Sequence, residues 1–460
     1  MRHYLRFIDL EAKFDEQGFV HKPGAAFKLV QSQPENYADF YHLGPSRTTW
    51  NVLREDMDKL MLDHAVEQGV KVFEETRVES LIFEGGTDSG RPISAFWKNK
   101  QGGSGSIKFE WLVDASGRQG LMSTKYLKNR LIREGLKNVA VYGYWKGVTR
   151  YKESRRGEVA PCTDRSGWAW VIPLPQGITS IGIVMHQETS NKKKAQCKGG
   201  LVDHYMEQLK LCPGVQTFIG EKGEFIEGST RSTSDYSYHA TAYSGDHFRI
   251  IGDAAAFIDP LFSSGVHIAL TGALSAACTI LGVRKGQVTE VEAQAWHDAK
   301  IGICQTRFLM VVLSAYRQMH HEGVRAVVTD IDDKTFEQAF EFFRPVYIGE
   351  TDTEAKLSER TMETLIEFTR SLFIPTTHEQ EQYVFETVSP ELLSVSGPLI
   401  GSEELEKVLD TDHGDAKAVL KKLNALKIER ADTSPDSFTW DAVNGYVVQL
   451  ERGKLGLVKA

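Results

Sequence analysis

Two stretches of the sequence each end an apolar run at an acidic residue, a pattern typical of a ligand-binding strand end. In WLVDASGRQG, residues 111–120, Asp114 leads into a turn of small residues, where glycine lets the backbone approach a ligand closely. In FRIIGDAAAFIDPLFSSGVHIALTGALSAA, residues 248–277, the apolar run ends at Gly252 and Asp253. A carboxylate at Asp253 could accept hydrogen bonds from a polyol, such as the ribityl chain of a flavin. The alternative is an ordinary strand that ends in a polar turn.

The second stretch continues into a candidate anion site. Ser263, Ser264 and Gly265 stand directly before an unbroken helical run. The first turn of a helix offers free N–H groups and the positive end of the helix dipole, so it can hold an anion. A serine that only caps a buried helix would give the same pattern. The Gly252–Asp253 pair earlier in the stretch favours the ligand-binding interpretation.

The third stretch, GWAWVIPL at residues 167–174, contains two alternating tryptophans. On a strand, Trp168 and Trp170 face the same side. There they are either ordinary core residues or the wall of a site for a planar cofactor. A further candidate is Lys28, which lies in the apolar segment at residues 24–30. A lysine in such a segment is rarely there for solubility, although its ammonium group could also reach water from a strand.

Together these stretches resemble a known family. DASGR and GDAAAFIDP are similar to the second and third fingerprints of FAD enzymes built like aromatic hydroxylases. The WxWxIP motif and DPLFSSGV, residues 259–266, are similar to those of flavin-dependent halogenases, above all the fungal enzymes that chlorinate phenolic rings of polyketides. WxWxIP consists here of Trp168, Trp170, Ile172 and Pro173. The resemblance covers about residues 15–350, and the later part of the chain has no motif that we can match.

The resemblance implies a chemistry and a set of residue roles. In that family reduced FAD reacts with oxygen to give a hydroperoxide, chloride attacks it to give hypochlorous acid, and a lysine directs the oxidant to an aromatic carbon. Lys28 matches this lysine, and the backbone amides of Ser264 and Gly265 match the chloride site. Trp168 and Trp170 match the pair that keeps organic substrate away from the flavin. The residues that match FAD contacts are Arg54, Asp114, Gly252, Asp253, Pro260 and Val266.

The resemblance also narrows the substrate and the partners. Tryptophan-specific halogenases carry a glutamate in the DPLxS stretch, where this chain has Phe262. This difference implies a phenol or another small electron-rich aromatic substrate, and leaves open whether it is free or carrier-bound. No NADPH-binding segment is visible, so a separate flavin reductase is the expected partner.

One part of the family pattern is absent from this sequence. The family begins with a strand and a GxGxxG turn that hold the FAD pyrophosphate at a helix N-terminus. Residue 1 of this chain matches a family position beyond that first βαβ unit. We therefore expect a truncated FAD domain and weakened FAD binding. Two other interpretations stay open: an FAD-dependent aromatic hydroxylase, against which WxWxIP argues, and a non-catalytic binding protein, which the missing unit favours.

The candidate residues need elements to position them. The pattern predicts a helix over residues 51–70 that ends at Gly69, and a buried strand over 248–252 followed by a helix through Val283. Short strands are predicted at 70–73, 80–83, 93–97, 107–113, 139–148, 168–174 and 179–185, with a hairpin tip inside 98–106 and a solvated loop at 192–194. Residues 351–372 are a candidate amphipathic helix, and residues 445–457 a closing hairpin.

The expected fold class is α/β with mixed α+β character. It combines an FAD-binding, Rossmann-like domain of the aromatic-hydroxylase type, an antiparallel-sheet substrate domain and a helical C-terminal region. We expect residues 1–135 to be the remainder of the FAD domain, with part of the substrate region at 15–50. Residues 136–247 should form the substrate-domain sheet, 248–300 the GD motif and helix of the FAD domain, and 301–460 a mainly helical region.

Composition argues against several other functions. The 460 residues are 41% hydrophobic and 25% charged, as in ordinary globular proteins, and the net charge of −8 argues against nucleic-acid binding. Five cysteines without a CxxC pair indicate reduced thiols and a cytoplasmic location. Residues 260–283 carry no formal charge, but their many small residues favour a helix inside the protein over a transmembrane segment. His320 and His321 are adjacent, so no metal site is expected.

Overall fold

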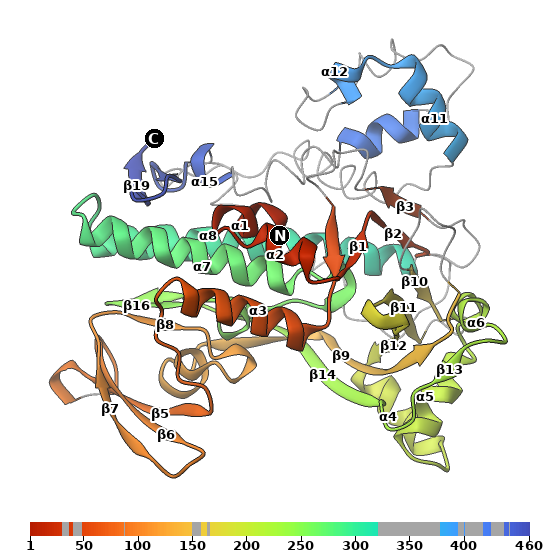
Figure 1. Cartoon of the computed structure of the whole chain (residues 1–460), viewed down its shortest axis with the longest axis horizontal. Helices are drawn as coiled ribbons and strands as arrows, with labels where there is room; N and C mark the ends of the chain where they lie inside the picture. Colours follow the sequence, from red (N-terminus) through yellow and green to blue (C-terminus); the bar gives the residue numbers. More distant parts are fainter. Residues whose placement is uncertain are drawn as a thin grey trace.

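The computed structural model describes residues 1–29, 36–39, 48–86, 88–149, 158–162, 166–320, 378–393, 400, 417–424, 437–440 and 442–460. For residues 36–39 and 158–161 only the backbone is described. Two long helices, α7 (Gly265–Arg284) and α8 (Glu290–His320), lie side by side across the middle of the molecule (Figure 1). Most of the sheet strands lie below them in this view, whereas the last strand, β19 (Gly456–Lys459), lies above them.

The largest sheet has nine strands and carries the tryptophan-rich stretch. Its order is β17-β14-β9-β12-β11-β10-β2-β3, with β13 paired to β9, and only the β10–β2 pairing is parallel. Its strands are β2 (Gly24–Phe27), β3 (Asn36–Asp39), β9 (Arg130–Lys146), β10 (Glu158–Pro161), β11 (Gly167–Pro173), β12 (Thr179–His186), β13 (Glu224–Phe225), β14 (Arg231–Ala240) and β17 (Ala256–Phe257). The strands predicted over 139–148, 168–174 and 179–185 are thus confirmed, as β9, β11 and β12.

Each face of this sheet has its own core, because side chains alternate along a strand. We call the side that bears Trp168 the front face and the opposite side the rear face. The front face packs against α8, with Leu136, Ala140, Trp168, Val184 and Val312 in one cluster. The rear face is covered by α5 (Leu201–Leu209) and α6 (Pro213–Ile219), and α4 (Gln187–Gln196) contacts β9, β12 and α5. The rear cluster includes Ala169, Val171, Ile181, Ile183, Tyr205 and Val215.

Smaller sheets and short helices surround these two layers. One sheet joins β15 (Ser244–Gly245), β16 (Phe248–Ile250) and β8 (Leu112–Asp114), and another joins β5 (Thr76–Phe83), β6 (Pro92–Asn99) and β7 (Ser104–Lys108). The remaining named elements are α1 (Arg2–Phe7), α2 (Glu11–Glu16), β1 (Val20–Lys22), β4 (Thr49–Asn51), α3 (Arg54–Glu67), α11 (His378–Thr387), α12 (Pro390–Leu393), α15 (Ser437–Trp440), β18 (Tyr446–Gln449) and β19 (Gly456–Lys459). The mixed class of helix and sheet is as predicted.

The structure confirms some predicted elements and corrects others. Helix α3 and the β18–β19 hairpin occur where they were predicted, and Gly69 follows α3 with a φ of 88°. The strand predicted at residues 70–73 is wrong: Val70 and Phe73 are 54% and 69% exposed, and the strand begins at Thr76. Residues 351–372 lie outside the described residues.

The loop predicted at residues 192–194 is also wrong, because these lysines lie inside α4. A run of lysines is compatible with a helix when one face meets polar partners. Lys193 Nζ donates to Ser166 Oγ (2.9 Å) and to Gln208 Oε1 (3.0 Å), so the helix is tied to the sheet and to α5 by hydrogen bonds rather than by an apolar stripe.

Among the described residues, α7 is the one helix long and apolar enough to cross a membrane by length and composition. Half of its most apolar window is buried inside the protein. The helix packs on α8, on β19 and on the turn after β16. These contacts account for its apolar sequence.

Candidate functional site

Strands β8 and β16 bring the two acidic strand ends together. They are parallel, with Asp114 opposite Ile250, and the Ile251 N–H donates to the Asp114 carbonyl (3.0 Å). The buried Asp114 carboxylate accepts hydrogen bonds from the backbone N–H groups of Ser116 (3.0 Å) and Met122 (2.6 Å). Asp114 therefore holds the turn after β8, and it would serve a ligand through that turn rather than through its carboxylate.

Gly252 begins the turn that leaves β16. Its φ of 55° lies in the left-handed region, which favours glycine, and a Cβ at this position would lie 3.3 Å from the Cβ of Ala269 in α7. Asp253 follows and is half-buried, and its carbonyl accepts a hydrogen bond from the Tyr238 hydroxyl (2.6 Å). Helix α7 therefore packs closely on the end of β16. A turn without a side chain at this point also leaves the backbone accessible for close approach to a ligand.

The segment between β17 and α7 contains the predicted anion site. The Asp259 carboxylate accepts from the Leu261 N–H (3.1 Å) and so caps the 3-10 turn Pro260–Phe262. Ser264 is only 4% exposed, its side chain does not cap α7, and its Oγ has no hydrogen-bond partner among the described residues. A buried hydroxyl without a partner costs free energy. Beside the free N–H groups of the first turn, it is the kind of unsatisfied donor that an anion would complete.

The two tryptophans lie on the front face of β11, as predicted. Their ring centroids are 5.9 Å apart; Trp168 is 2% exposed and Trp170 is half-buried. Trp170 Nε1 donates to Ser180 Oγ on β12 (3.1 Å). The Trp170 indole lies over Gly182, where a Cβ would come within 2.2 Å of the ring. Ile172 and Pro173 end the strand, paired with Ser180 and Thr179.

A buried polar network holds Trp168. Its Nε1 donates to the Tyr316 hydroxyl (2.7 Å), which donates to the Asp259 carboxylate (3.1 Å). Asn138 Nδ2 donates to the same carboxylate (2.6 Å) and to the Tyr316 hydroxyl (2.9 Å). Burial, together with the charge of Asp259, raises the pKa of Tyr316 well above its ordinary value, so this hydroxyl remains a donor. The network joins β9, β11, α8 and the segment before α7.

Sequence reasoning missed this network. Asn138 and Tyr316 are 121 and 57 positions away from Asp259, so no local spacing links them. The available signals were an aspartate directly before a proline in DPLFSSGV and an asparagine directly before the apolar run VAVYGYW. Neither signal identifies the residue with which the side chain forms its hydrogen bond.

Lys28 follows β2 directly and is half-buried. Its neighbours Phe27 and Leu29 pack in the cluster that contains Trp168 and Phe262, and the Phe27 and Phe262 ring centroids are 5.3 Å apart. The structure therefore brings the lysine segment, the tryptophan strand and the segment before α7 into one region of the front face.

The remaining predicted contacts lie beside this region. Arg54 opens α3, its side chain is 65% exposed, and it forms an ion pair with Asp58 (3.0 Å). Val266, in the first turn of α7, packs against the cluster that includes Trp50 and Met57. Since Met57 belongs to α3, Arg54 and Val266 lie on neighbouring elements.

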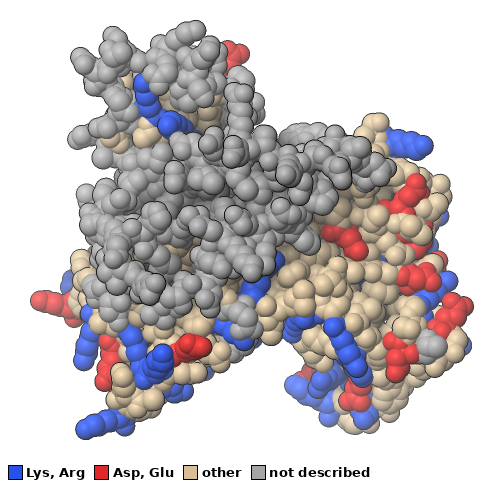
Figure 2. All heavy atoms as spheres, turned by 180° about the vertical axis from the view of Figure 1, so that it is seen from behind, with Lys and Arg blue, Asp and Glu red and all other residues tan. Residues whose placement is uncertain are grey.

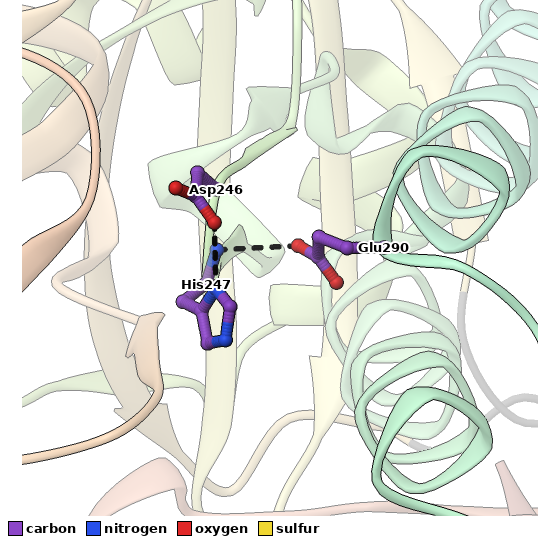
Figure 3. A group of neighbouring side chains, drawn as sticks. All are labelled: Asp246, His247 and Glu290. Carbon is purple, nitrogen blue, oxygen red and sulfur yellow. Dashed lines mark hydrogen bonds and ion pairs between the residues drawn. The ribbon is translucent and has the colours of Figure 1, made fainter. Parts of the chain in front are cut away.

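One group of side chains elsewhere has the composition of a metal site (Figure 3). His247 Nδ1 lies 2.6 Å from Asp246 Oδ1, and the His247 N–H donates to Glu290 Oε1 (3.2 Å). Both Glu290 oxygens also accept from the fully buried Arg249 guanidinium, at 2.9 and 3.1 Å. Because this guanidinium already neutralises the carboxylate, we assign the group a structural role that ties β16 to the start of α8.

The fold is that of FAD-dependent halogenases. The myxobacterial chondrochloren halogenase CndH matches with a TM-score of 0.65 and 24% identity over 82% of this chain and 86% of its own. CmlS, a flavin-dependent halogenase, matches with a TM-score of 0.63 and 26% identity over 84% of this chain and 69% of its own.

Comparisons with known sequences give higher identities than those with solved structures. The tryptophan halogenase family model matches residues 20–317. The flavin-dependent halogenase armH5 of Armillaria mellea is 64% identical over all of this chain and 90% of its own length, and the sulochrin halogenase gedL of Aspergillus terreus is 41% identical over all of this chain and 85% of its own. The chain therefore belongs to the flavin-dependent halogenase family. It is an oxidoreductase-type enzyme of secondary metabolism that uses FAD, with chloride as the expected halide, and such enzymes generally need a separate flavin reductase.

Proposed function

We propose that this enzyme chlorinates an electron-rich aromatic ring of the phenolic, polyketide type, and that Lys28 delivers the chlorine. Phe262, half-buried beside Phe27, gives this part of the site an apolar aromatic surface. A relative that is 41% identical is named for the halogenation of sulochrin, which makes sulochrin a reasonable first substrate to test. The observation that carries the proposal is the convergence of three segments on the front face: the residues on either side of Lys28 (Phe27 and Leu29), the tryptophan strand and the segment before α7.

The residues at the strand ends fit a flavin. Gly252 and Asp253 form a closely packed turn, the Asp114 turn lies beside it, and Pro260 and Val266 flank the start of α7. These residues, with Arg54, would hold FAD. When bound and reduced, FAD would supply with oxygen the oxidising equivalent that turns chloride into hypochlorous acid. The backbone amides of Ser264 and Gly265 would hold the chloride, and the unsatisfied Ser264 hydroxyl supports this assignment.

Trp168 and Trp170 would separate the organic substrate from the flavin, so that oxygen goes to chloride and not to the ring. Trp168 suits this role because the hydrogen bond from its Nε1 to the Tyr316–Asp259 network fixes the position of its indole. The Lys28 ammonium or amine would then bind the oxidant and direct it to the aromatic carbon.

Replacement of Lys28 by alanine tests this proposal. The protein is supplied with reduced FAD at a saturating concentration, oxygen, chloride and a phenolic substrate, and product is measured by mass spectrometry through its chlorine isotope pattern. We expect chlorinated product to fall by orders of magnitude while oxygen consumption continues, because the oxygen reaction does not involve Lys28. Lys13→Ala, which removes a lysine of α2 paired with Glu67, is the matched control and should retain full chlorination.

Two results would contradict the proposal. If Lys28→Ala keeps more than about a tenth of wild-type chlorination, a barrier change below ~1.4 kcal/mol, Lys28 does not deliver the chlorine. If the wild-type enzyme instead makes a hydroxylated product at a rate insensitive to chloride, it is a hydroxylase.

We also propose a cytoplasmic enzyme that does not bind nucleic acid. All five cysteines lie in the described part of the chain and are present as thiols. Basic and acidic side chains are interspersed over the described surface of the face in Figure 2, without the basic stripe that a phosphate backbone would require.

The substrate arrives either free or on a carrier, and the chlorination assay with each form distinguishes them.

A further inference from the structure

Two cysteines that are far apart in the sequence meet on the rear face. The Sγ atoms of Cys162 and Cys212 lie 3.3 Å apart, although the residues are 50 positions apart in the chain. Both side chains are fully buried. Cys162 directly follows β10, and Cys212 stands at the start of α6.

The pair joins the tryptophan strand to the rear helices. The Cys162 N–H donates to the Gly167 carbonyl (2.8 Å), and Pro161 pairs with Trp168 in the β10–β11 ladder. Cys212 packs in the rear cluster with Leu209 of α5 and Val215 of α6. A covalent link here would tie the strand pair that carries the tryptophans to the helical layer behind it.

We propose that Cys162 and Cys212 are a redox modification site and form a reversible intramolecular disulfide with hydrogen peroxide. One thiolate attacks the peroxide, which gives a sulfenic acid and releases the first oxygen as water. The second sulfur then attacks the sulfenic sulfur, forms the S–S bond and displaces the second oxygen as water. Two thiols and one peroxide thus become one disulfide and two waters, and a dithiol reductant reverses the change.

The geometry favours this pair over the other cysteines. A disulfide bond is about 2.05 Å long, so the two sulfurs need to approach by about 1.2 Å. Cys162 and Cys212 lie at element ends, where small shifts are possible. The other three lie elsewhere: Cys197 ends α4, Cys278 is inside α7 and Cys304 is inside α8. The enzyme's own chemistry can supply the oxidant, because reduced flavin and oxygen give hydrogen peroxide when no halogenation follows.

Thiol counting on the whole protein tests the proposal. Wild-type protein is treated with hydrogen peroxide, quenched, unfolded and alkylated, and the free thiols are counted by intact mass. We expect two thiols to be lost together, to return with dithiothreitol, and to appear as a peptide in which Cys162 is linked to Cys212. Because the link closes a loop of 50 residues, the oxidised protein should melt roughly 5 °C higher.

Variants make the result specific. Cys162→Ala and Cys212→Ala should each abolish the linked peptide and the rise in Tm, and alanine avoids placing a new hydroxyl in the rear core. Cys197→Ala, which changes a half-buried cysteine directly after α4, should retain both. The proposal is overturned if peroxide converts the two cysteines separately to sulfinic acids, or if neither thiol is lost at a concentration that oxidises Cys197.

Discussion

The front and rear faces of the nine-stranded sheet contain the same hydrogen-bonded pair in two different settings. On the front, Trp168 donates to Tyr316 (2.7 Å); on the rear, Trp145 donates to Tyr205 (2.9 Å). The Tyr205 hydroxyl donates a hydrogen bond to the backbone carbonyl of Ile181 (2.9 Å), so the rear pair ends in a neutral group of the sheet itself. The front pair ends instead in the Asp259 carboxylate, which is fully buried.

This difference separates a purely structural arrangement from one that reaches the proposed site. A buried carboxylate is costly unless several donors satisfy it, and a tyrosine can be held without one, as the rear face demonstrates. Asp259 also caps the turn before α7, so the front network links the Trp168 indole to the segment that carries Ser264 and Gly265. The rear pair links only elements of its own core.

The largest effect is expected when the carboxylate itself is removed. Asp259→Ala leaves Tyr316, Asn138 and the Leu261 N–H without their acceptor, and should lower the free energy of unfolding by about 3 kcal/mol. Urea denaturation measures this. The control, Asp246→Ala, removes a 54% exposed carboxylate paired with His247, and should cost less than about 1 kcal/mol. Equal losses for the two variants would mean that the front network contributes no more to the free energy of unfolding than a surface ion pair does.

A smaller and more selective effect is expected from the two tyrosines. Tyr316→Phe and Tyr205→Phe each remove one buried hydroxyl and should each cost about 1–2 kcal/mol of stability. Only Tyr316→Phe should lower the chlorinated product formed per reduced FAD consumed, by about tenfold, because only it releases the indole and the segment before α7 from a fixed geometry. A similar product yield for both variants would show that the front network does not position the site.

At neutral pH the smallest effect is that of a buried histidine, because its contribution to stability changes only as the pH falls. His267, between the rings of Tyr4 and Phe308, has its pKa lowered by burial to about 3, whereas burial lowers the pKa of the rear His204 without so large a shift. A histidine that is neutral when folded takes up a proton on unfolding below its ordinary pKa of about 6.5. Stability should therefore fall as the pH drops from about 6.5 toward 3, by up to ~1.4 kcal/mol per pH unit for His267.

Unfolding curves of wild type and single variants at several pH values within this window separate the two histidines. His267→Gln should flatten the dependence more than His204→Gln. Identical slopes in all three proteins would place the acid sensitivity in other groups, such as His297, whose pKa burial also lowers to about 3.

The sequence predicts those parts of the molecule that depend on local periodicity. The alternation of Trp168 and Trp170 predicts their shared face, and the two apolar runs that end in Asp114 and Asp253 predict strands that the structure pairs in parallel. It fails where a long-range partner decides the outcome. The lysines at residues 192–194 are helical because Ser166 and Gln208 receive Lys193, and Tyr316 reaches Trp168 across 148 positions of chain.

The Trp170 indole rests on main chain, because Gly182 offers no side chain beneath it. The depth at which the half-buried ring sits is therefore set by its neighbour on β12. A residue with even one methyl group at position 182 would lift the ring away from the sheet and take up space on its open side. In the proposed site, the size of the aromatic molecule that fits beside Trp170 therefore depends on residue 182 as well as on the residues that contact that molecule.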